Sequence, residues 1–237
     1  MDASVPLDHP TADRPHRVYF AVTNHCNRAC PWCSTYSSPR GRTWLSVEDY
    51  AARFPVTGAF EVQLEGGEPT IHPRFAELVR IARGEPRCTR VVVCTNGVVL
   101  PRAVAALRAW VESLGAPLTV KLSVNHHLLD HDRGLLALAA ALRDTMAALG
   151  GDRLLVLNVR LRPGVEEDDA RVRRAVEEAG LLPHANVFFL QRYGLASDEE
   201  TWQRPFTVAD RFTMVNPDGS VHGTDLVERS EAMGRLP

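Results

Sequence analysis

The sequence predicts an α/β protein built as a partial (β/α)6 TIM-like barrel of parallel strands, followed by a short C-terminal hairpin and helix. Segments rich in β-branched and aromatic residues alternate with longer segments of helical period, which is the pattern of a parallel sheet with right-handed crossovers. The length of 237 residues suits six such units better than the eight of a full barrel, for which about 250 residues are typical.

Six segments have the composition of strands, because β-branched and aromatic side chains favour the pleated backbone. The segments between them place apolar residues three and four positions apart, as amphipathic helices do. The helix at 166–179 also has acids at its start and Gly180 just beyond its end, which suits the helix dipole and the C-cap. The predicted strands are 17–23, 60–65, 90–95, 118–124, 154–161 and 186–190. A first helix is predicted to begin at Ser46, and four further helices are predicted at 72–83, 101–114, 133–149 and 166–179.

The pattern changes after Tyr193. Residues 216–219 (Asn-Pro-Asp-Gly) have the composition of a turn and separate two short apolar segments, 212–215 and 220–222, so a hairpin is expected there. Residues 225–233 are expected to form a last short helix. We therefore divide the chain into an N-terminal extension (1–16), a barrel core (17–195) and a C-terminal appendage (196–237) that covers the barrel.

Charge and hydropathy exclude several classes of partner. The net charge is −2 and the pI is near 6.5, so no basic field indicates a nucleic acid or a membrane surface. The longest apolar run, 135–142, is far shorter than the roughly 20 residues that span a bilayer. The first sixteen residues show no secretory signal, so a cytoplasmic location is expected. Lysine occurs once, at Lys121, beside many scattered arginines.

Five cysteines in a chain without an export signal argue against a disulfide framework. Three of them, Cys26, Cys30 and Cys33, lie within eight residues directly after the first predicted strand. Thiolates suit iron–sulfur clusters or zinc, and a zinc site would take a fourth ligand from His25 or His72. The spacing of the cysteines alone does not decide between these metals. Three thiolates without a fourth would leave one iron of a four-iron cluster open.

The motif C-x3-C-x2-C resembles the signature of the radical S-adenosylmethionine (radical SAM) superfamily, and three further motifs match in order, each at a predicted strand end. These are residues 65–70 (Glu-Gly-Gly-Glu-Pro-Thr), 95–97 (Thr-Asn-Gly) and 123–125 (Ser-Val-Asn). Residues 131–134 and the hairpin at 216–224 resemble the branch that modifies peptides and makes redox cofactors. Gly223 and Thr224 stand where that branch carries an auxiliary-cluster cysteine, so one cluster is expected here.

The resemblance implies a 4Fe-4S cluster held by the three cysteines, with S-adenosylmethionine (SAM) chelating the fourth iron and yielding a 5′-deoxyadenosyl radical. Gly66 and Gly67 would let the backbone approach the methionine moiety closely, and Glu68 would accept a hydrogen bond from its ammonium group. Trp32 would meet the adenine, and Arg160 would bind the SAM carboxylate or an acidic substrate. The residues expected to contact SAM are Trp32, Gly66, Gly67, Glu68, Thr95, Asn96, Ser123, Asn125, Asn158 and Arg160.

Polar residues at other strand ends are the candidates for substrate contact, because reacting groups in such barrels sit at the carboxyl ends of the strands. They are Gln63, Glu65, His126, Arg162, Gln191 and Tyr193, and among them Glu65, Tyr193 and His126 are also candidates for catalysis. Arg162 could equally be a solvated strand end. Cys94 is expected to be an ordinary core thiol, and Cys88 a loop cysteine without a cluster partner.

The expected function is therefore that of a minimal radical SAM enzyme that abstracts hydrogen from a small polar substrate. The outcome could be epimerisation, elimination, rearrangement or coupling, in natural-product or cofactor biosynthesis. A one-electron donor such as flavodoxin or ferredoxin is expected, and the sequence leaves the oligomeric state open. Two alternatives stand beside it: a peptide-modifying enzyme or glycyl-radical activase, and a non-catalytic zinc or Fe-S protein.

Overall fold

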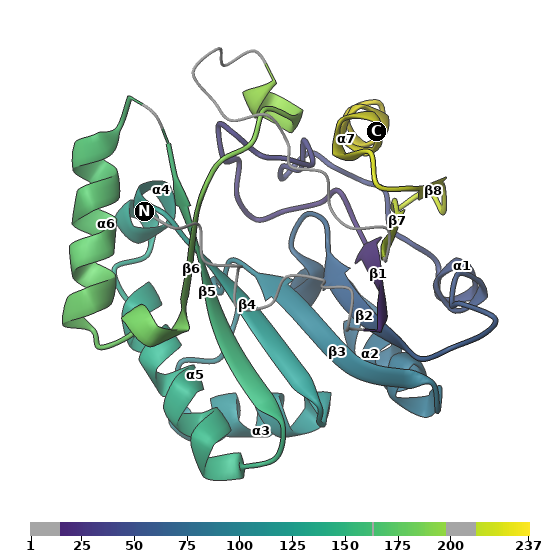
Figure 1. The fold of residues 1–237 in the computed structure, drawn as a ribbon, viewed down its shortest axis with the longest axis horizontal. Helices are drawn as coiled ribbons and strands as arrows, with labels where there is room; N and C mark the ends of the chain where they lie inside the picture. The colour runs from purple at the N-terminus through teal and green to yellow at the C-terminus, as the bar shows by residue number, and fades with distance from the viewer. Residues whose placement is uncertain (1–14, 163, 198–211) are drawn as a thin grey trace.

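The computed structural model describes residues 15–162, 164–197 and 212–237. Within them, eight strands form one open sheet in the order β6-β5-β4-β3-β2-β1-β7-β8 (Figure 1). Neighbouring strands are parallel except for β7 and β8, so the predicted α/β fold with a parallel, unclosed sheet is confirmed. The strands are β1 (His16–Ala21), β2 (Phe60–Glu65), β3 (Cys88–Thr95), β4 (Leu118–Val124), β5 (Arg153–Leu161), β6 (Ala185–Phe189), β7 (Phe212–Val215) and β8 (Val221–His222).

The helices follow the expected order with shifted ends. Ser46 caps α1 as predicted, because its hydroxyl accepts a hydrogen bond from the Asp49 N–H at 2.9 Å. The second helix begins later than predicted, at Phe75 rather than at residue 72, because His72 has extended backbone and ends the 3-10 turn Pro69–Ile71. One short helix, α4, was not predicted, and the Asn125 side chain caps it. The helices are α1 (Val47–Ala52), α2 (Phe75–Gly84), α3 (Val104–Leu114), α4 (His126–His131), α5 (Leu135–Leu149), α6 (Glu166–Glu178) and α7 (Leu226–Gly234).

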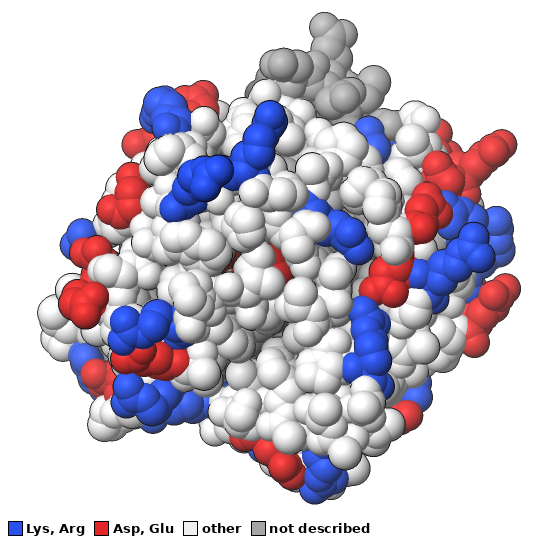
Figure 2. All heavy atoms as spheres, turned by 180° about the vertical axis from the view of Figure 1, so that it is seen from behind, with Lys and Arg blue, Asp and Glu red and all other residues white. Residues whose placement is uncertain are grey.

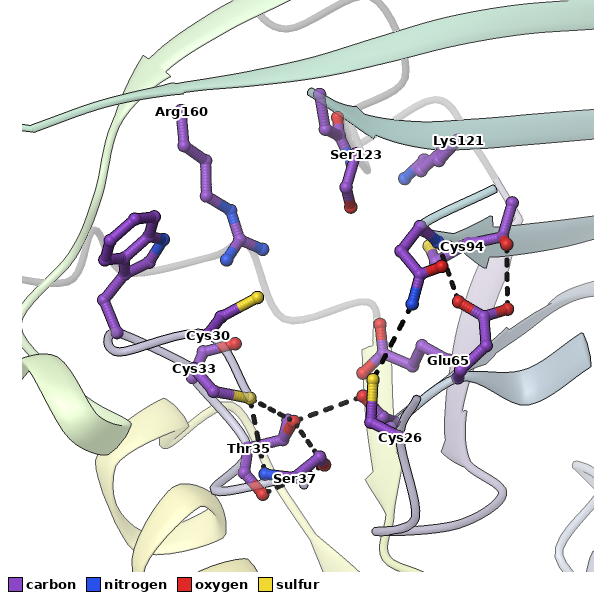
Figure 3. A pocket seen from close by; sticks show the side chains of 18 of the residues that line it. Cys26, Cys30, Cys33, Thr35, Ser37, Glu65, Cys94, Lys121, Ser123 and Arg160 are labelled. Carbon is purple, nitrogen blue, oxygen red and sulfur yellow. Dashed lines mark hydrogen bonds between the residues drawn. The ribbon is translucent and has the colours of Figure 1, made fainter. Parts of the chain in front are cut away.

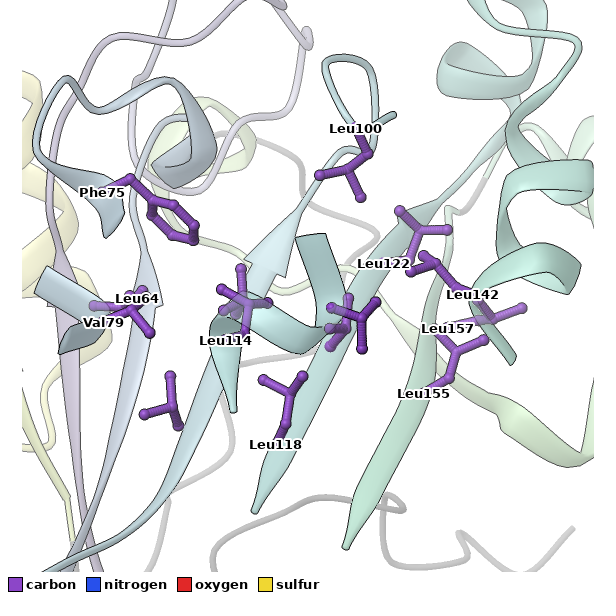
Figure 4. Packing of buried hydrophobic residues seen from close by; sticks show 14 of the residues in the cluster. Leu64, Phe75, Val79, Leu100, Leu114, Leu118, Leu122, Leu142, Leu155 and Leu157 are labelled. Carbon is purple, nitrogen blue, oxygen red and sulfur yellow. The ribbon is translucent and has the colours of Figure 1, made fainter. Parts of the chain in front are cut away.

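The two faces of the sheet differ in chemistry. In β2, Val62 and Leu64 belong to the main apolar core, whereas Gln63 and Glu65 line a cavity on the opposite face. The same alternation recurs along the sheet, because successive side chains of a strand point to opposite sides. Figure 4 shows leucines of the strands and of the outer helices packed together in this core. Burying one apolar face leaves the other free to carry polar residues.

The C-terminal hairpin continues the main sheet. β7 pairs in parallel with β1, and Arg17 lies opposite Phe212 in the register, while β8 pairs antiparallel with β7. This pairing covers the edge of β1, which would otherwise expose unpaired backbone groups. The segments 198–211 and 1–14, which hold the start of the expected appendage and most of the expected N-terminal extension, lie outside the described residues.

A buried ion pair links the amino-terminal ends of β1 and β2. The fully buried Arg17 guanidinium donates to Glu61 Oε2 from Nε at 2.8 Å and from Nη2 at 2.5 Å. The two residues are register partners on adjacent strands, so the pair ties these strands together beneath the cavity. An uncompensated charge at this depth would be costly, and each partner therefore depends on the other.

The surface carries charges of both signs. On the face drawn in Figure 2, acidic and basic side chains alternate around the periphery, and the central area consists mostly of uncharged residues. No helix in the described part of the chain combines the length and the apolar character needed to cross a bilayer.

Candidate active site

A cavity of about 320 Å³ opens at the carboxyl ends of the strands, on the polar face of the sheet. Its size falls in the range of small-molecule sites. All ten residues expected to contact SAM line it, as do the three clustered cysteines and four of the six substrate candidates, Gln63, Glu65, Gln191 and Tyr193. His126 and Arg162 are not among the residues that line the cavity. The topology thus brings most of the residues selected from the sequence around one space.

The loop after β1 directs the three cysteine sulfurs toward the same part of this cavity (Figure 3). The Cys33 sulfur accepts a hydrogen bond from the Ser37 N–H at 3.3 Å and lies 3.4 Å from the Thr35 hydroxyl. The Cys26 sulfur accepts one from Asn96 Nδ2 at 3.7 Å. Two of the sulfurs therefore have polar neighbours that would stabilise a thiolate bound to a metal.

Burial keeps two of these thiols protonated in the absence of a metal. It raises the pKa of Cys26 to about 12 and that of Cys30 to about 11. Soft metals displace such protons, since the thiolate is the form that binds them. Among the described residues, no three His, Cys, Asp or Glu side chains converge on a point where a single metal ion would sit. The donor set, three sulfurs spread around an open cavity, fits an iron–sulfur cluster.

Gly66 and Gly67 hold the cysteine loop against β2. The Gly67 N–H donates to the Thr23 carbonyl at 2.6 Å, and the next N–H, of Glu68, donates to the His25 carbonyl at 3.0 Å. A Cβ on Gly67 would lie 2.0 Å from the His25 carbonyl oxygen, and one on Gly66 would lie 2.5 Å from that of Thr23. Gly66 also has a φ of 115°. The lack of side chains at this turn therefore admits the backbone of the cysteine loop, a role the sequence did not reveal.

Glu68 connects the ends of β2 and β3. Its Oε1 accepts hydrogen bonds from the Thr70 hydroxyl at 2.5 Å and the Thr95 hydroxyl at 2.8 Å, and its Oε2 accepts one from the Asn96 N–H at 2.8 Å. Burial raises the pKa of this carboxyl group, and these hydrogen bonds oppose the rise. A spare lone pair on Oε2 remains for a further donor in the cavity.

Arg160 projects from β5 into the cavity on the side of Cys30 (Figure 3). Its guanidinium lies 5.7 Å from the centre of the Phe188 ring, and it makes no hydrogen bond or ion pair with any residue that the structure describes. Ser123 of β4 and Asn158 of β5 are register partners that line the same wall. A cation without a protein partner in a cavity is suited to bind an anionic group.

Trp32 is enclosed by protein side chains. The Arg162 guanidinium stacks 3.9 Å from the centre of its ring, and the His126 ring lies 5.2 Å away. This stacking explains why Arg162, expected to face the substrate, does not line the cavity. His126 lies on α4 beside Trp32 rather than in the cavity wall, and its Nδ1 is buried with no hydrogen-bond partner in the described part of the chain. The side chains of Arg162 and His126 both pack against the Trp32 ring and so hold it in place.

The sequence did not reveal the contribution of α7. Its Arg229 lines the cavity and donates from Nη2 to Glu65 Oε1 at 2.9 Å, and from Nε to Asn216 Oδ1 at 2.9 Å. Phe212, Met214 and Leu226 line the cavity beside it. Arg229 could not be recognised as a site residue from a single sequence, because only the pairing of β7 with β1 brings α7 to the cavity.

The expectation for Cys94 was wrong. Val91 and Val93 of β3 face the helices, so the alternation of the strand directs Cys94 to the cavity, which it lines. Cys88 packs against the main core, and its sulfur donates to the Arg90 carbonyl at 3.6 Å. Gln191 and Tyr193 follow β6 and line the cavity, and Gln191 Oε1 is buried with no hydrogen-bond partner among the residues that the structure describes.

Comparison with known proteins places these features in a family. Residues 20–146 match the model of the radical SAM superfamily. The chain is 38% identical over 93 residues to the GTP 3',8-cyclase of Chlorobaculum tepidum, which covers 38% of the chain and 28% of that protein. It is 23% identical over 219 residues to the 7,8-dihydro-6-hydroxymethylpterin dimethyltransferase of Methanocaldococcus jannaschii, covering 86% of the chain and 42% of that protein. The chain thus spans less than half of these relatives.

Solved structures show the same fold. Streptococcus suis SuiB, in a crystal structure bound to S-adenosylmethionine, superposes with a TM-score of 0.51 at 13% sequence identity. The match covers 87% of this chain and 59% of that one.

Proposed function

The chain belongs to the radical SAM superfamily, and from this premise we propose that it removes a hydrogen atom from a small polar substrate during natural-product or cofactor biosynthesis. Enzymes of this superfamily use a 4Fe-4S cluster and S-adenosylmethionine. When bound, the two supply a 5′-deoxyadenosyl radical after the transfer of one electron. Membership in an enzyme superfamily also sets aside the alternative of a non-catalytic zinc protein.

Cys26, Cys30 and Cys33 are the residues that would hold three of the four irons. The three cysteines line one cavity, and burial raises the pKa of Cys26 and Cys30, so a bound metal would have to displace the protons of these two thiols. Asn96 and the Ser37 N–H, each within hydrogen-bond distance of a sulfur, would stabilise the bound thiolates. This convergence of three soft donors on a cavity with a polar wall is the observation that carries the proposal.

The other walls supply groups that match the parts of S-adenosylmethionine. Arg160, which has no polar partner among the described residues, would bind its carboxylate, and Glu68 Oε2 would accept from its ammonium group. Ser123 and Asn158 offer a hydroxyl and an amide on the same wall. Trp32, held by Arg162 and His126, lines the cavity and would contact the adenine. These residues would orient the molecule and exclude water from it.

Two features support a small polar substrate. The cavity is lined by amide, carboxylate and cationic groups from several strands. The two curated relatives carry the names of enzymes that act on GTP and on a hydroxymethylpterin, both small polar molecules. A cavity of about 320 Å³ with polar groups on its walls suits a molecule of this class.

Anaerobic reconstitution with iron and sulfide tests the proposal. The wild-type protein should bind about four irons, show an EPR spectrum that changes on addition of S-adenosylmethionine, and form 5′-deoxyadenosine with dithionite. The variant in which the three loop cysteines are replaced by alanine should do none of these, whereas Cys88→Ser should behave as the wild type. A wild-type protein that binds a cluster but leaves S-adenosylmethionine intact would overturn the proposal.

A further inference from the structure

A continuous row of hydrogen bonds crosses the cavity floor from β4 to α7. Lys121 Nζ donates to Gln63 Oε1 at 2.9 Å, and Gln63 Nε2 donates to Glu65 Oε2 at 2.6 Å. Arg229 then donates to Glu65 Oε1 at 2.9 Å, and Asn216 fixes the other end of the guanidinium. Each side chain is held by its neighbours, so the row presents donors and acceptors at fixed positions.

The row keeps unused capacity at its α7 end. The Glu65 carboxylate has about four lone-pair positions, and two N–H donors occupy it among the described residues. The Arg229 guanidinium has five N–H groups, and only one at Nε and one at Nη2 donate to protein oxygens in that part of the chain. Free acceptors and free donors therefore stand side by side, in one ion pair between the buried Arg229 and the half-buried Glu65.

An apolar wall adjoins this row. Tyr19 is the register partner of Gln63 on the neighbouring strand, and its ring packs edge-on against Phe212 at 5.3 Å. Met214 lies opposite Tyr19 in β7, and Leu226 completes the cluster. Carbon–hydrogen groups of a ligand can pack on this wall while its oxygens reach the row, which is the usual division of a small-molecule site.

We propose that Glu65 and Arg229 bind neighbouring hydroxyl groups of the substrate, which is therefore a polyhydroxylated small molecule, and that α7 is part of the substrate site. The proposal rests on the proposed function, since it names the substrate class of the same cavity. A hydroxyl group both donates and accepts, so two adjacent ones satisfy Glu65 and Arg229 together. Glu65 and Arg229 carry opposite charges, so a group that both donates and accepts matches the pair better than a group of a single charge.

Saturation-transfer NMR on the reconstituted protein with S-adenosylmethionine tests this. Three six-carbon probes separate the chemistries: myo-inositol as the polyol, adipate as the dianion and hexamethylenediamine as the dication. The protein should bind myo-inositol, and Arg229→Met should weaken that binding at least about tenfold, because a charge-assisted hydrogen bond is lost. Arg229→Lys, which keeps the charge, should retain part of it. Arg53→Met is the matched control, since Arg53 contacts the Gly219 carbonyl of the same hairpin at 3.2 Å from outside the cavity.

Formation of 5′-deoxyadenosine with dithionite is measured on each variant. A failure of the proposed function is therefore distinguished from a failure of the proposal on the substrate class. Arg53→Met should cleave S-adenosylmethionine at the wild-type rate, because Arg53 lies outside the cavity. Preferential binding of adipate or of hexamethylenediamine overturns the proposal, as does the absence of binding by all three probes. Equal loss of myo-inositol binding in Arg53→Met would show that the loss does not depend on a group in the cavity, and would also overturn it.

Discussion

Replacing Gly67 by alanine should dislodge the cysteine loop. The added Cβ would lie 2.0 Å from the His25 carbonyl oxygen and 2.6 Å from its carbon, whereas ordinary contact begins at 3.4 Å. The loop must therefore retreat by about 1.4 Å, the difference between 3.4 and 2.0 Å. Because the obstacle is backbone rather than the end of a flexible side chain, it cannot move aside alone.

The cost combines two effects. Overpacking of this kind costs about 1–3 kcal/mol. The retreat also strains the hydrogen bonds from the Gly67 and Glu68 N–H groups to the loop, each worth roughly 0.5–1.5 kcal/mol. Together they lower the free energy of unfolding by about 2–6 kcal/mol. A displacement of the cysteines by more than 1 Å should also lower the iron content after reconstitution.

Urea unfolding of the metal-free protein and iron analysis after reconstitution measure both effects. Gly84→Ala is the control, because a Cβ there meets nothing within 4 Å and the position has no left-handed backbone. That variant should be stabilised slightly, by about 0.4–1 kcal/mol. If Gly67→Ala matches Gly84→Ala in urea midpoint and in iron content, the close backbone contact does not position the loop.

Three further predictions concern the metal ligands and the buried charges. Serine at any one of the loop cysteines should abolish most iron binding, whereas Cys88→Ser should leave the iron-to-protein ratio unchanged. The pKa values of Cys26 and Cys30 are raised above the ordinary 9.0, so the folded metal-free protein favours the protonated thiols. In urea unfolding, the stability of the metal-free protein should therefore be full below pH 9 and should fall as the pH rises toward 11 and 12. The cluster-bound protein should not show this fall. Arg17→Met should cost about 1–3 kcal/mol in urea unfolding, because the buried Glu61 carboxylate then keeps, among the described residues, only the Arg90 guanidinium, 3.7 Å away, whereas Arg108→Met, which breaks an exposed pair, should cost less than about 1 kcal/mol.

The sequence predicted the parts of the fold that depend on local pattern. The β-branched and aromatic composition located β2 and β4 to the residue, and the Ser46 cap located the start of α1. The prediction from the sequence was wrong where one local pattern was compatible with two environments. The run of valines before Cys94 suggested core on both faces, yet the same alternation turned that thiol into the cavity. Residues 126–131 were too short to show a helical period, so α4 was missed.

The candidate site was predicted where each residue ends a strand, since a parallel sheet brings all such ends together. Arg229 could not be found in this way, because its place depends on a pairing between strands from distant parts of the chain. Arg162 continues the inward face of β5 by simple counting. The strand ends at Leu161, however, and the side chain turns to stack on Trp32. Counting along a strand is reliable only as far as the strand continues.

The pairing of β7 with β1 also separates two tasks along the gene. The groups that would generate the radical lie on the loops after β1, β2 and β3, whereas one wall of the cavity comes from residues 212–229. Exchange of that late segment between homologous chains can therefore alter which molecule is accepted while the metal-binding loop stays intact. Evolution, or a protein engineer, can therefore vary the cavity wall formed by the late segment without changing the metal-binding loop.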